Sequence, residues 1–140
     1  VSSLLSSIWD ETNKVIKNEY KKIYIWPNDV RMILNSDSGE FLPFKFSQIY
    51  VLHPDPWPKA RHEKRRLLNS EFLNLLSSSL NNNGNIIIGT DHHEYYDWVL
   101  NQLKNTSLKI KSTDVDIIKT RYQQKNKANT IAPKYLILSK

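Results

Sequence analysis

The stretch HPDPWPKARHEKRR, residues 53–66, decides how this sequence is interpreted. In its first half, Asp55 stands between Pro54 and Pro56. Because proline fixes φ at about −65° and restricts the residue before it, we expect the Asp55 carboxylate to be held in one direction. The second half begins at Lys59 and carries five Lys or Arg residues in eight positions. A rigid acidic corner is therefore followed directly by a dense positive patch.

Short β-prone runs and amphipathic helices alternate on both sides of this stretch. Strands are predicted at 23–26, 49–52 and 86–88, with two further candidates at 108–110 and 135–138. Apolar residues spaced three to four apart predict helices at 3–20, from Leu67 to Leu80 and from Tyr96 to Leu103, and a helical turn is predicted at 31–34. The alternation predicts an α/β fold with parallel strands and right-handed crossovers.

Local signals predict where these helices begin and end. The NNNG run at 81–84 is expected to end the second helix, because Asn and Gly tolerate positive φ. Asp91 is expected to cap the third helix, with Glu94 reaching back to complete a capping box. The polar segments at 36–39 and 120–129 are expected to be loops.

Length and composition limit the class of protein. With 140 residues, we expect one domain covering residues 1–140. The content of 39% hydrophobic and 24% charged residues is typical of a globular chain, and no apolar run reaches membrane-spanning length. The absence of cysteine excludes disulfides, thiolate zinc sites and a cysteine nucleophile, and it fits a cytoplasmic protein. A net charge of +6 favours a polyanionic partner.

Three acids follow three predicted strands. Asp29, Asp55 and Asp91 each come shortly after a strand, and in open α/β sheets ligands bind outside the carboxyl ends of the strands. The three carboxylates are therefore expected to converge on one site. The alternative for Asp91 is an ordinary turn or helix-cap role, because Asp is common at both. For Asp55 that alternative is weaker, since prolines restrict the backbone on both sides.

The basic run also has two interpretations. At α-helical spacing, Lys59, His62 and Arg66 would share one face. One interpretation is a solvated helix start. The other is a phosphate-binding patch, because cations at a helix N-terminus oppose the helix dipole and are unfavourable there without an anionic partner. Packing of this patch against the Asp55 corner would put a phosphate clamp beside a carboxylate crevice.

Residues 53–66 resemble the FPDPWxKxRHxKRR signature of the bacterial tRNA (guanine-N7)-methyltransferases. The resemblance continues through PNDVRMIL at 27–34, IIIGTD at 86–91 and TRYQ at 120–123, which is similar to T[KR][FY]E in that family. It implies a class I, Rossmann-like methyltransferase sheet with antiparallel strands at its C-terminal end. It also implies S-adenosylmethionine as the methyl donor and N7 of a guanine in the tRNA variable loop as the acceptor.

The resemblance further implies roles for individual residues. Asn28 and Asp29 would lie on the adenosine side of the cofactor, and Asp55 would be the central catalytic acid near donor and substrate. Lys59 and Asp91 would contact the guanosine. The remaining residues would act on the tRNA. The residues that would bind the tRNA backbone are Arg61, His62, Lys64, Arg65 and Arg66. The residues that would close over the base are Thr120, Arg121, Tyr122 and Gln123. No metal is implied.

Chemistry argued from the residues agrees with this resemblance. Guanine N7 carries a free lone pair, so no general base is needed, and methylation leaves a positive charge on the ring. A fixed carboxylate beside the ring stabilises that charge and accepts hydrogen bonds from the guanine N1 and N2 donors. Extruding a stacked base costs about a few kcal/mol, which phosphate contacts offset. Trp57 is either a stacking platform or a packing residue.

The sequence also departs from the family pattern. Its three glycines, Gly39, Gly84 and Gly89, do not form the glycine-rich strand-to-helix turn of the cofactor site. We therefore expect a C-terminal portion of the enzyme that needs an N-terminal half, fused or separate, and exposes a sheet edge without it. Gln123 replaces a Glu, and His53 stands where Phe is usual.

Parts of the sequence also fit three other functions. The first is a non-catalytic RNA-binding remnant of such an enzyme. The second is a methyltransferase acting on exocyclic amines, against which the KARHEKRR continuation argues. The third is a metal-dependent nuclease, suggested by Pro54-Asp55 and His92-His93. The nuclease is disfavoured because adjacent histidines on a helix point away from a common metal.

Overall fold

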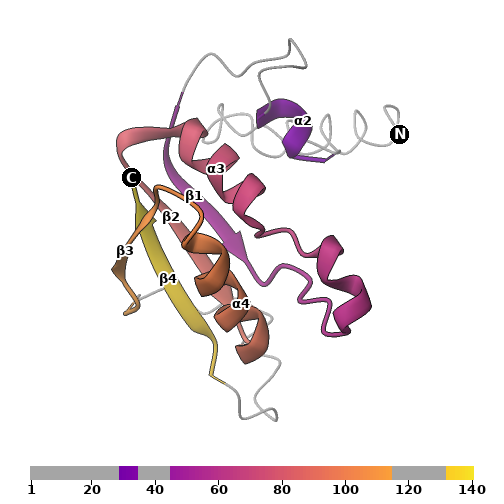
Figure 1. Ribbon diagram of the computed structural model, residues 1–140. Coiled ribbons are helices and arrows are strands. Elements are labelled where there is room, and N and C mark those ends of the chain that lie inside the picture. Colours follow the sequence, from indigo (N-terminus) through magenta and orange to yellow (C-terminus); the bar gives the residue numbers. More distant parts are fainter. Residues whose placement is uncertain (1–28, 35–44, 115–131) are drawn as a thin grey trace, which may run out of the picture.

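The computed structural model describes residues 29–34, 45–114 and 132–140 (Figure 1). The expected helix at 3–20, the strand at 23–26 and the polar loops at 36–39 and 120–129 lie outside the described residues. The elements that are described are α2 (Arg31–Leu34), β1 (Phe46–Leu52), the 3₁₀ helix η2 (Ala60–Arg65), α3 (Ser70–Ser79), β2 (Leu80–Thr90), α4 (His93–Leu103), β3 (Lys109–Ser112) and β4 (Lys134–Ser139).

The four strands form one mixed sheet in the order β1-β2-β4-β3. β1 and β2 are parallel, with Leu52 opposite Gly89, and α3 connects them. β4 is antiparallel to β2, and β3 is antiparallel to β4. This confirms the predicted α/β class, the parallel pair and the antiparallel strands at the C-terminal end. It is the architecture of a partial Rossmann-like methyltransferase sheet.

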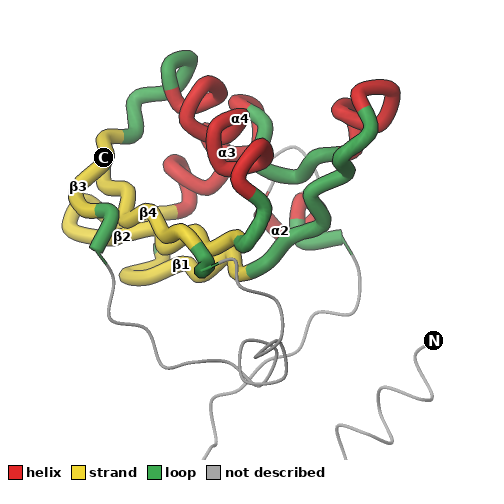
Figure 2. Tube along the Cα trace, turned by 90° about the horizontal axis from the view of Figure 1, so that it is seen from below, coloured by secondary structure: helices red, strands yellow, loops and turns green. Residues whose placement is uncertain are grey.

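Helices α3 and α4 lie on one side of the sheet (Figure 2). The core lies between these layers and follows the period-two alternation of a strand. Ile86 and Ile88 of β2 point into it, as do Leu136 and Leu138 of β4, all at 0–1% exposure. The helices contribute a matching face that consists of Phe72, Leu73, Leu76, Val99 and Leu103. None of the described helices is long and apolar enough to cross a bilayer.

Helix α3 begins at a cap that the sequence analysis did not identify. Asn69 is the N-cap, and its Oδ1 accepts a hydrogen bond of 2.9 Å from the Phe72 backbone N–H. Such caps satisfy backbone donors that the first helical turn leaves without intrahelical partners. Because α3 begins at Ser70, Leu67 and Leu68 precede it in the chain, although Leu68 is fully buried.

The prediction that this helix ends at the NNNG run is confirmed, but the positive φ expected in that run is wrong. The helix ends at Ser79, and residues 81–84 lie inside β2, whose pairing with β1 begins at Leu80 opposite Phe46. Among the described residues other than glycine, positive φ occurs at His53 and Trp57 instead. Residues 81–84 lie between the two stretches of β2 that pair with β1, at Leu80 and from Asn85 onward, so the run is an irregularity within the strand. Within it, the Asn83 backbone N–H donates to Asn81 Oδ1 over 3.2 Å.

The prediction that Asp91 caps α4 is also wrong. The N-cap is His92, whose Nδ1 accepts a hydrogen bond of 3.3 Å from the Tyr95 backbone N–H. The His92 backbone N–H in turn donates to Thr90 Oγ1 over 3.2 Å. The helix therefore starts one residue later than predicted, and Asp91 remains at the end of β2.

Tyr95 joins the two helices in the core. It is fully buried, and its hydroxyl accepts a hydrogen bond of 3.3 Å from the Leu68 backbone N–H. Burial raises the pKa of Tyr95 to about 12, because the phenolate is poorly solvated there. The hydroxyl therefore stays protonated across the physiological range.

Candidate functional site

The proline-rich corner, residues 53–58, connects β1 to η2. It leaves the sheet through His53, whose backbone N–H donates a 2.7 Å hydrogen bond to the Gly89 carbonyl of β2. His53 has φ of 51° and Trp57 has φ of 43°, both in the left-handed region that non-glycine residues rarely adopt. Such conformations persist only where the surroundings hold them, and they cluster at functional sites.

Two of the three predicted acids follow neighbouring strand ends. Asp55 comes after β1 and is exposed, while Asp91 comes directly after β2 and is partly buried. Because these strands are parallel and paired up to Leu52 and Gly89, both acids leave the sheet at the same edge. The His53 Nδ1 lies 3.9 Å from Asp91 Oδ1, so the end of β1 also reaches the acid that follows β2.

Asp29 has a different local role. It lies just before α2, where one carboxylate oxygen accepts hydrogen bonds of 2.9 Å from both the backbone N–H and Nε of Arg31. A further contact with Arg31 Nη2 completes an ion pair. These bonds hold the pKa of the Asp29 carboxyl below its usual value. Asp29 thus anchors the start of α2, which contacts α3, and its convergence with Asp55 and Asp91 stays a prediction.

The basic run forms a 3₁₀ helix, so the predicted α-helical face of Lys59, His62 and Arg66 is wrong. A 3₁₀ helix has three residues per turn, which aligns residues three apart. His62 and Arg65 accordingly meet the same partner, the Trp57 ring. The His62 ring packs edge-on at 5.6 Å between centroids, and the Arg65 guanidinium lies 4.9 Å from the Trp57 centroid. Part of the basic run therefore packs against the corner.

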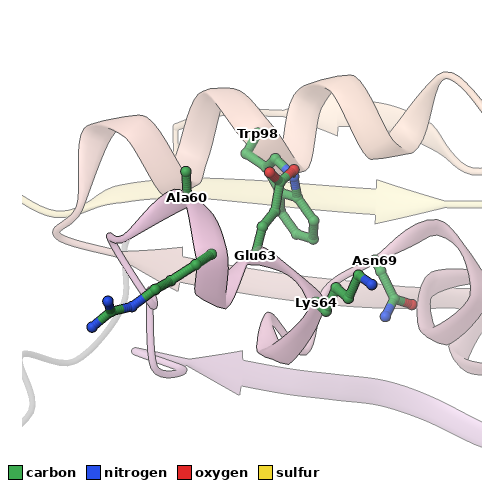
Figure 3. Close-up of a pocket in the computed structure, with 6 residues that line it drawn as sticks. Ala60, Glu63, Lys64, Asn69 and Trp98 are labelled. Carbon is green, nitrogen blue, oxygen red and sulfur yellow. The ribbon is translucent and has the colours of Figure 1, made fainter.

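The other sides of η2 face α4. Glu63 points toward Trp98 of α4, and its Oε1 accepts a 2.5 Å hydrogen bond from the indole Nε1 (Figure 3). A surface pocket of about 460 Å³ lies at this junction. It is lined by Ala60, Arg61, Glu63, Lys64, Asn69 and Trp98. Arg61 and Lys64, three residues apart, therefore border one hollow beside the α3 N-cap.

Four cations of this segment are exposed, and they are called the η2 cations below. They are Lys59, Arg61, Lys64 and Arg65. Their concentration on one short element produces a local positive field that favours a phosphate-bearing ligand. His62 is partly buried against Trp57.

Arg66 differs from the η2 cations. It is 8% exposed, and its guanidinium lies 5.1 Å from the Trp98 centroid and 5.9 Å from the Tyr95 centroid. Its Nε donates to the Pro56 carbonyl over 3.0 Å, and its Nη2 donates to the Trp57 carbonyl over 3.3 Å. The structure therefore turns this predicted tRNA contact inward, toward the corner.

The remaining predicted site residues divide between described and undescribed parts of the chain. Lys59 is exposed at the start of η2. Asn28 and the predicted base-closing set, Thr120, Arg121, Tyr122 and Gln123, lie outside the described residues. Within ranges 29–34, 45–114 and 132–140 the glycines are Gly84 and Gly89, both inside β2, so these ranges hold no glycine-rich strand-to-helix turn. The same ranges hold no cluster of three or more side chains suited to a metal ion.

Sequence reasoning missed Trp98 and Glu63 as parts of this site. Trp98 belongs to a helix predicted from its apolar stripe, and Glu63 is the single acid in a basic run. The contact between them spans 35 residues of sequence. In the 3₁₀ helix Glu63 lies one third of a turn from His62, so it points away from the side that contacts Trp57.

Comparison with known proteins adds independent findings. A family model described as "Putative methyltransferase" matches residues 3–133. The tRNA (guanine-N(7)-)-methyltransferase of Wolbachia pipientis wMel is 41% identical over 93 residues, which cover 66% of this chain and 40% of that protein. The enzyme of the same name from Mycoplasmopsis pulmonis is 32% identical over 127 residues, covering 91% of this chain and 60% of that protein.

A longer relative also matches this chain over only part of its own length. The "Bifunctional methyltransferase" of Rickettsia typhi is 30% identical and covers 99% of this chain, but only 27% of its own length is matched. The chain thus spans between 27% and 60% of the length of these curated relatives.

Proposed function

This chain belongs to the methyltransferase family that includes the tRNA (guanine-N(7)-)-methyltransferases, and on that premise we propose that it takes part in methylating N7 of a guanine in tRNA. The methyl donor would be S-adenosylmethionine, the site the tRNA variable loop, and the compartment the cytoplasm. The proposal covers the chain as part of a larger catalytic unit, because it matches only 40–60% of the length of these relatives.

One observation carries the proposal. The Asp55 corner and Asp91 leave adjacent parallel strands at one edge of the sheet, and the η2 cations follow that corner directly. Ligands of open α/β sheets bind outside this edge, so a base held there would lie near carboxylates while its phosphates meet the cations. The carboxylates alone, or the η2 cations alone, would not suggest methyl transfer to a base of a nucleic acid.

The reaction needs positioning and charge stabilisation more than proton transfer. Guanine N7 would accept the methyl group with its own lone pair while the methyl–sulfur bond of the donor breaks and its electron pair stays on sulfur, which would leave the ring cationic. Asp55, exposed on a constrained corner, would face that ring and stabilise the developing charge. Asp91 and Lys59 would hold the guanosine. A corner fixed before substrate arrives lowers the entropy cost of the in-line geometry that methyl transfer requires.

The cofactor side is only partly represented in the described residues. Asn28, Asp29 and Asp55 are the proposed cofactor contacts. Asp29 is engaged with Arg31, and no glycine-rich turn that admits close backbone approach occurs in the described ranges. The described residues therefore do not fit an adenosine cradle by themselves. We propose that polypeptide beyond these 140 residues, fused or separate, completes it.

The tRNA side rests on the η2 cations. Each phosphate neutralised by Lys or Arg releases counterions, so tRNA affinity would fall steeply with salt. Arg61 and Lys64 border the pocket beside Trp98. The phosphate backbone would bind in this concave surface. Thr120, Arg121, Tyr122 and Gln123 would close over the base, and His62 would remain between Trp57 and the RNA.

The test is labelled methyl transfer from S-adenosylmethionine to an unmodified tRNA transcript, with the modified atom mapped. The chain is assayed alone and with the N-terminal half of a relative supplied. We expect transfer to guanine N7 only in the second case. Asp55→Asn should abolish turnover and leave tRNA affinity nearly unchanged, whereas Glu71→Gln, on the exposed side of α3, serves as the matched control. Transfer to another atom, or full activity of the Asp55 variant, contradicts the proposal.

A second candidate is a non-catalytic tRNA-binding protein of the same ancestry. The observation that favours it is the combination of four exposed cations with no glycine-rich turn in the described ranges. Salt-dependent tRNA binding without any methyl transfer, even when the complementing half is present, distinguishes this candidate from the first.

A further inference from the structure

We propose that Arg66 is a positioning residue that fixes the backbone of the Asp55 corner, and that it is not a phosphate contact. This inference deepens the proposed function and rests on it for the role of Asp55. The position of Arg66 in the structure is independent of that role. The sequence alone places Arg66 with its basic neighbours, since it ends an unbroken Lys-Arg-Arg run.

Burial separates Arg66 from this run. Its side chain is 8% exposed, whereas Lys64 and Arg65 are exposed. The guanidinium lies near the rings of Tyr95 and Trp98, at 5.9 Å and 5.1 Å, and those rings stack on each other at 5.7 Å. A cation held against two aromatic rings is stabilised where water is largely excluded. A phosphate would have to displace these contacts to reach it.

The hydrogen bonds of Arg66 explain what it does there. The planar guanidinium carries several donors in a fixed fork, and here it donates to two successive carbonyls, those of Pro56 and Trp57. These residues directly follow Asp55. Trp57 has φ of 43°, a conformation that needs support from its surroundings. Arg66 supplies this support from the inside, while Arg65 and His62 cover the Trp57 ring from η2.

The consequence is a chain of contacts from the helix layer to the acid. α4 holds the guanidinium through Tyr95 and Trp98, the guanidinium holds the corner carbonyls, and the corner orients Asp55. Lysine cannot replace Arg66 here, because a single ammonium lacks the fork that reaches both carbonyls along one plane. A loss of Arg66 should therefore loosen the corner without changing the phosphate contacts of the η2 cations.

The experiment compares two substitutions that each remove one positive charge, Arg66→Gln and Lys64→Gln. The first readout is the salt dependence of binding to an unmodified tRNA transcript. The second is the backbone order parameter of Asp55 and Trp57 from nitrogen-15 relaxation. Lys64→Gln should reduce the slope of log K against log salt by about 0.7–0.9. It should leave the corner order parameters near about 0.85.

Arg66→Gln should give the reverse pattern. The salt slope should equal that of the wild type, and the Trp57 order parameter should fall below about 0.6. A reduced salt slope, or a corner as rigid as in the wild type, overturns the proposal. If the Ile87 order parameter in β2 also falls in Arg66→Gln, the variant has lost its fold and Arg66→Lys takes its place. Lysine keeps the positive charge and a side chain of similar length but lacks the fork, so the Trp57 order parameter should still fall. If the wild type does not bind tRNA, the proposed function fails, and the relaxation result still decides the role of Arg66.

Discussion

Replacement of Gly89 by alanine tests the packing on which the candidate site is built. Gly89 lies in β2 between Leu52 of β1 and Tyr135 of β4. A Cβ atom there would lie 2.6 Å from Tyr135 Cε1 and 2.8 Å from Tyr135 Cδ1, with Leu52 Cδ2 at 3.2 Å. Separations under about 3 Å are too short for carbon atoms, so the Tyr135 ring must turn away. Glycine is therefore required at position 89 because the Tyr135 ring packs closely against its backbone, and not because of an unusual φ.

The expected cost follows from two opposing effects. Overpacking of a well-filled site costs about 1–3 kcal/mol. Alanine is less flexible than glycine in the unfolded chain and recovers about 0.5–1 kcal/mol in a strand. The balance is a destabilisation of about 1.5 kcal/mol. For a chain of this size that lowers Tm by about 6 °C. Urea unfolding followed by circular dichroism measures the same quantity at constant temperature.

The control is a double-mutant cycle with Tyr135→Ala, which removes the clashing ring. If the ring causes the cost, Gly89→Ala should be nearly neutral in the Tyr135→Ala background, giving a coupling energy of about 1 kcal/mol or more. Because Gly89 also accepts the hydrogen bond from His53, a shift of β2 should reach the corner as well. A Gly89→Ala variant within about 0.5 kcal/mol of the wild type would refute this reasoning.

Three further predictions concern titration, phosphate binding and helix capping. The pKa of Tyr95 is raised from 10.0 to about 12, so the folded state holds its proton more tightly than the unfolded state. Stability should therefore fall as pH rises from about 10 to about 12, by an amount of the order of 2–3 kcal/mol, and Tyr95→Phe should remove this dependence in urea titrations at several pH values. Replacing all four η2 cations by Gln should make the slope of log K for tRNA against log salt less steep by about 3, measured by filter binding; an unchanged slope places the phosphates elsewhere. Asn69→Ala should cost about 1 kcal/mol in thermal unfolding through loss of the bond to the Phe72 N–H, while Asn74→Ala, exposed in mid-helix, should cost much less.

Local apolar patterns were predicted well from the sequence. The apolar run at Ile86–Ile88 predicted a strand and the apolar stripe from Tyr96 to Leu103 predicted a helix, and β2 and α4 confirm both. The fixed direction of the Asp55 carboxylate, expected because two prolines restrict the backbone around it, stays a prediction. In each case the information lies within a few neighbouring residues.

Features that depend on a distant partner were not predicted. The Asn run at 81–84 was assigned to a turn because the strand that surrounds it, which pairs at Asn85 with Gln48 more than 30 residues earlier, is not visible locally. Arg66 was grouped with its neighbours because charge is visible in a sequence and burial against α4 is not. η2 is a 3₁₀ helix and not the α-helix that the spacing predicted. Residues three apart therefore share a side, and His62 and Arg65 both contact Trp57.

The position of β4 has a consequence for how this protein is made. β4 follows β3 in the chain, yet it lies between β2 and β3 in the sheet, and Leu136 and Leu138 are completely buried. During synthesis, β2 and β3 must therefore wait without their common partner until residues 134–139 leave the ribosome. Because the pairing joins segments about 50 residues apart, closure of the sheet should be a late and slow step. Until then the edge of β2 that pairs with β4 lacks its partner strand, and in that interval the nascent chain is most susceptible to chaperone binding, proteolysis and aggregation.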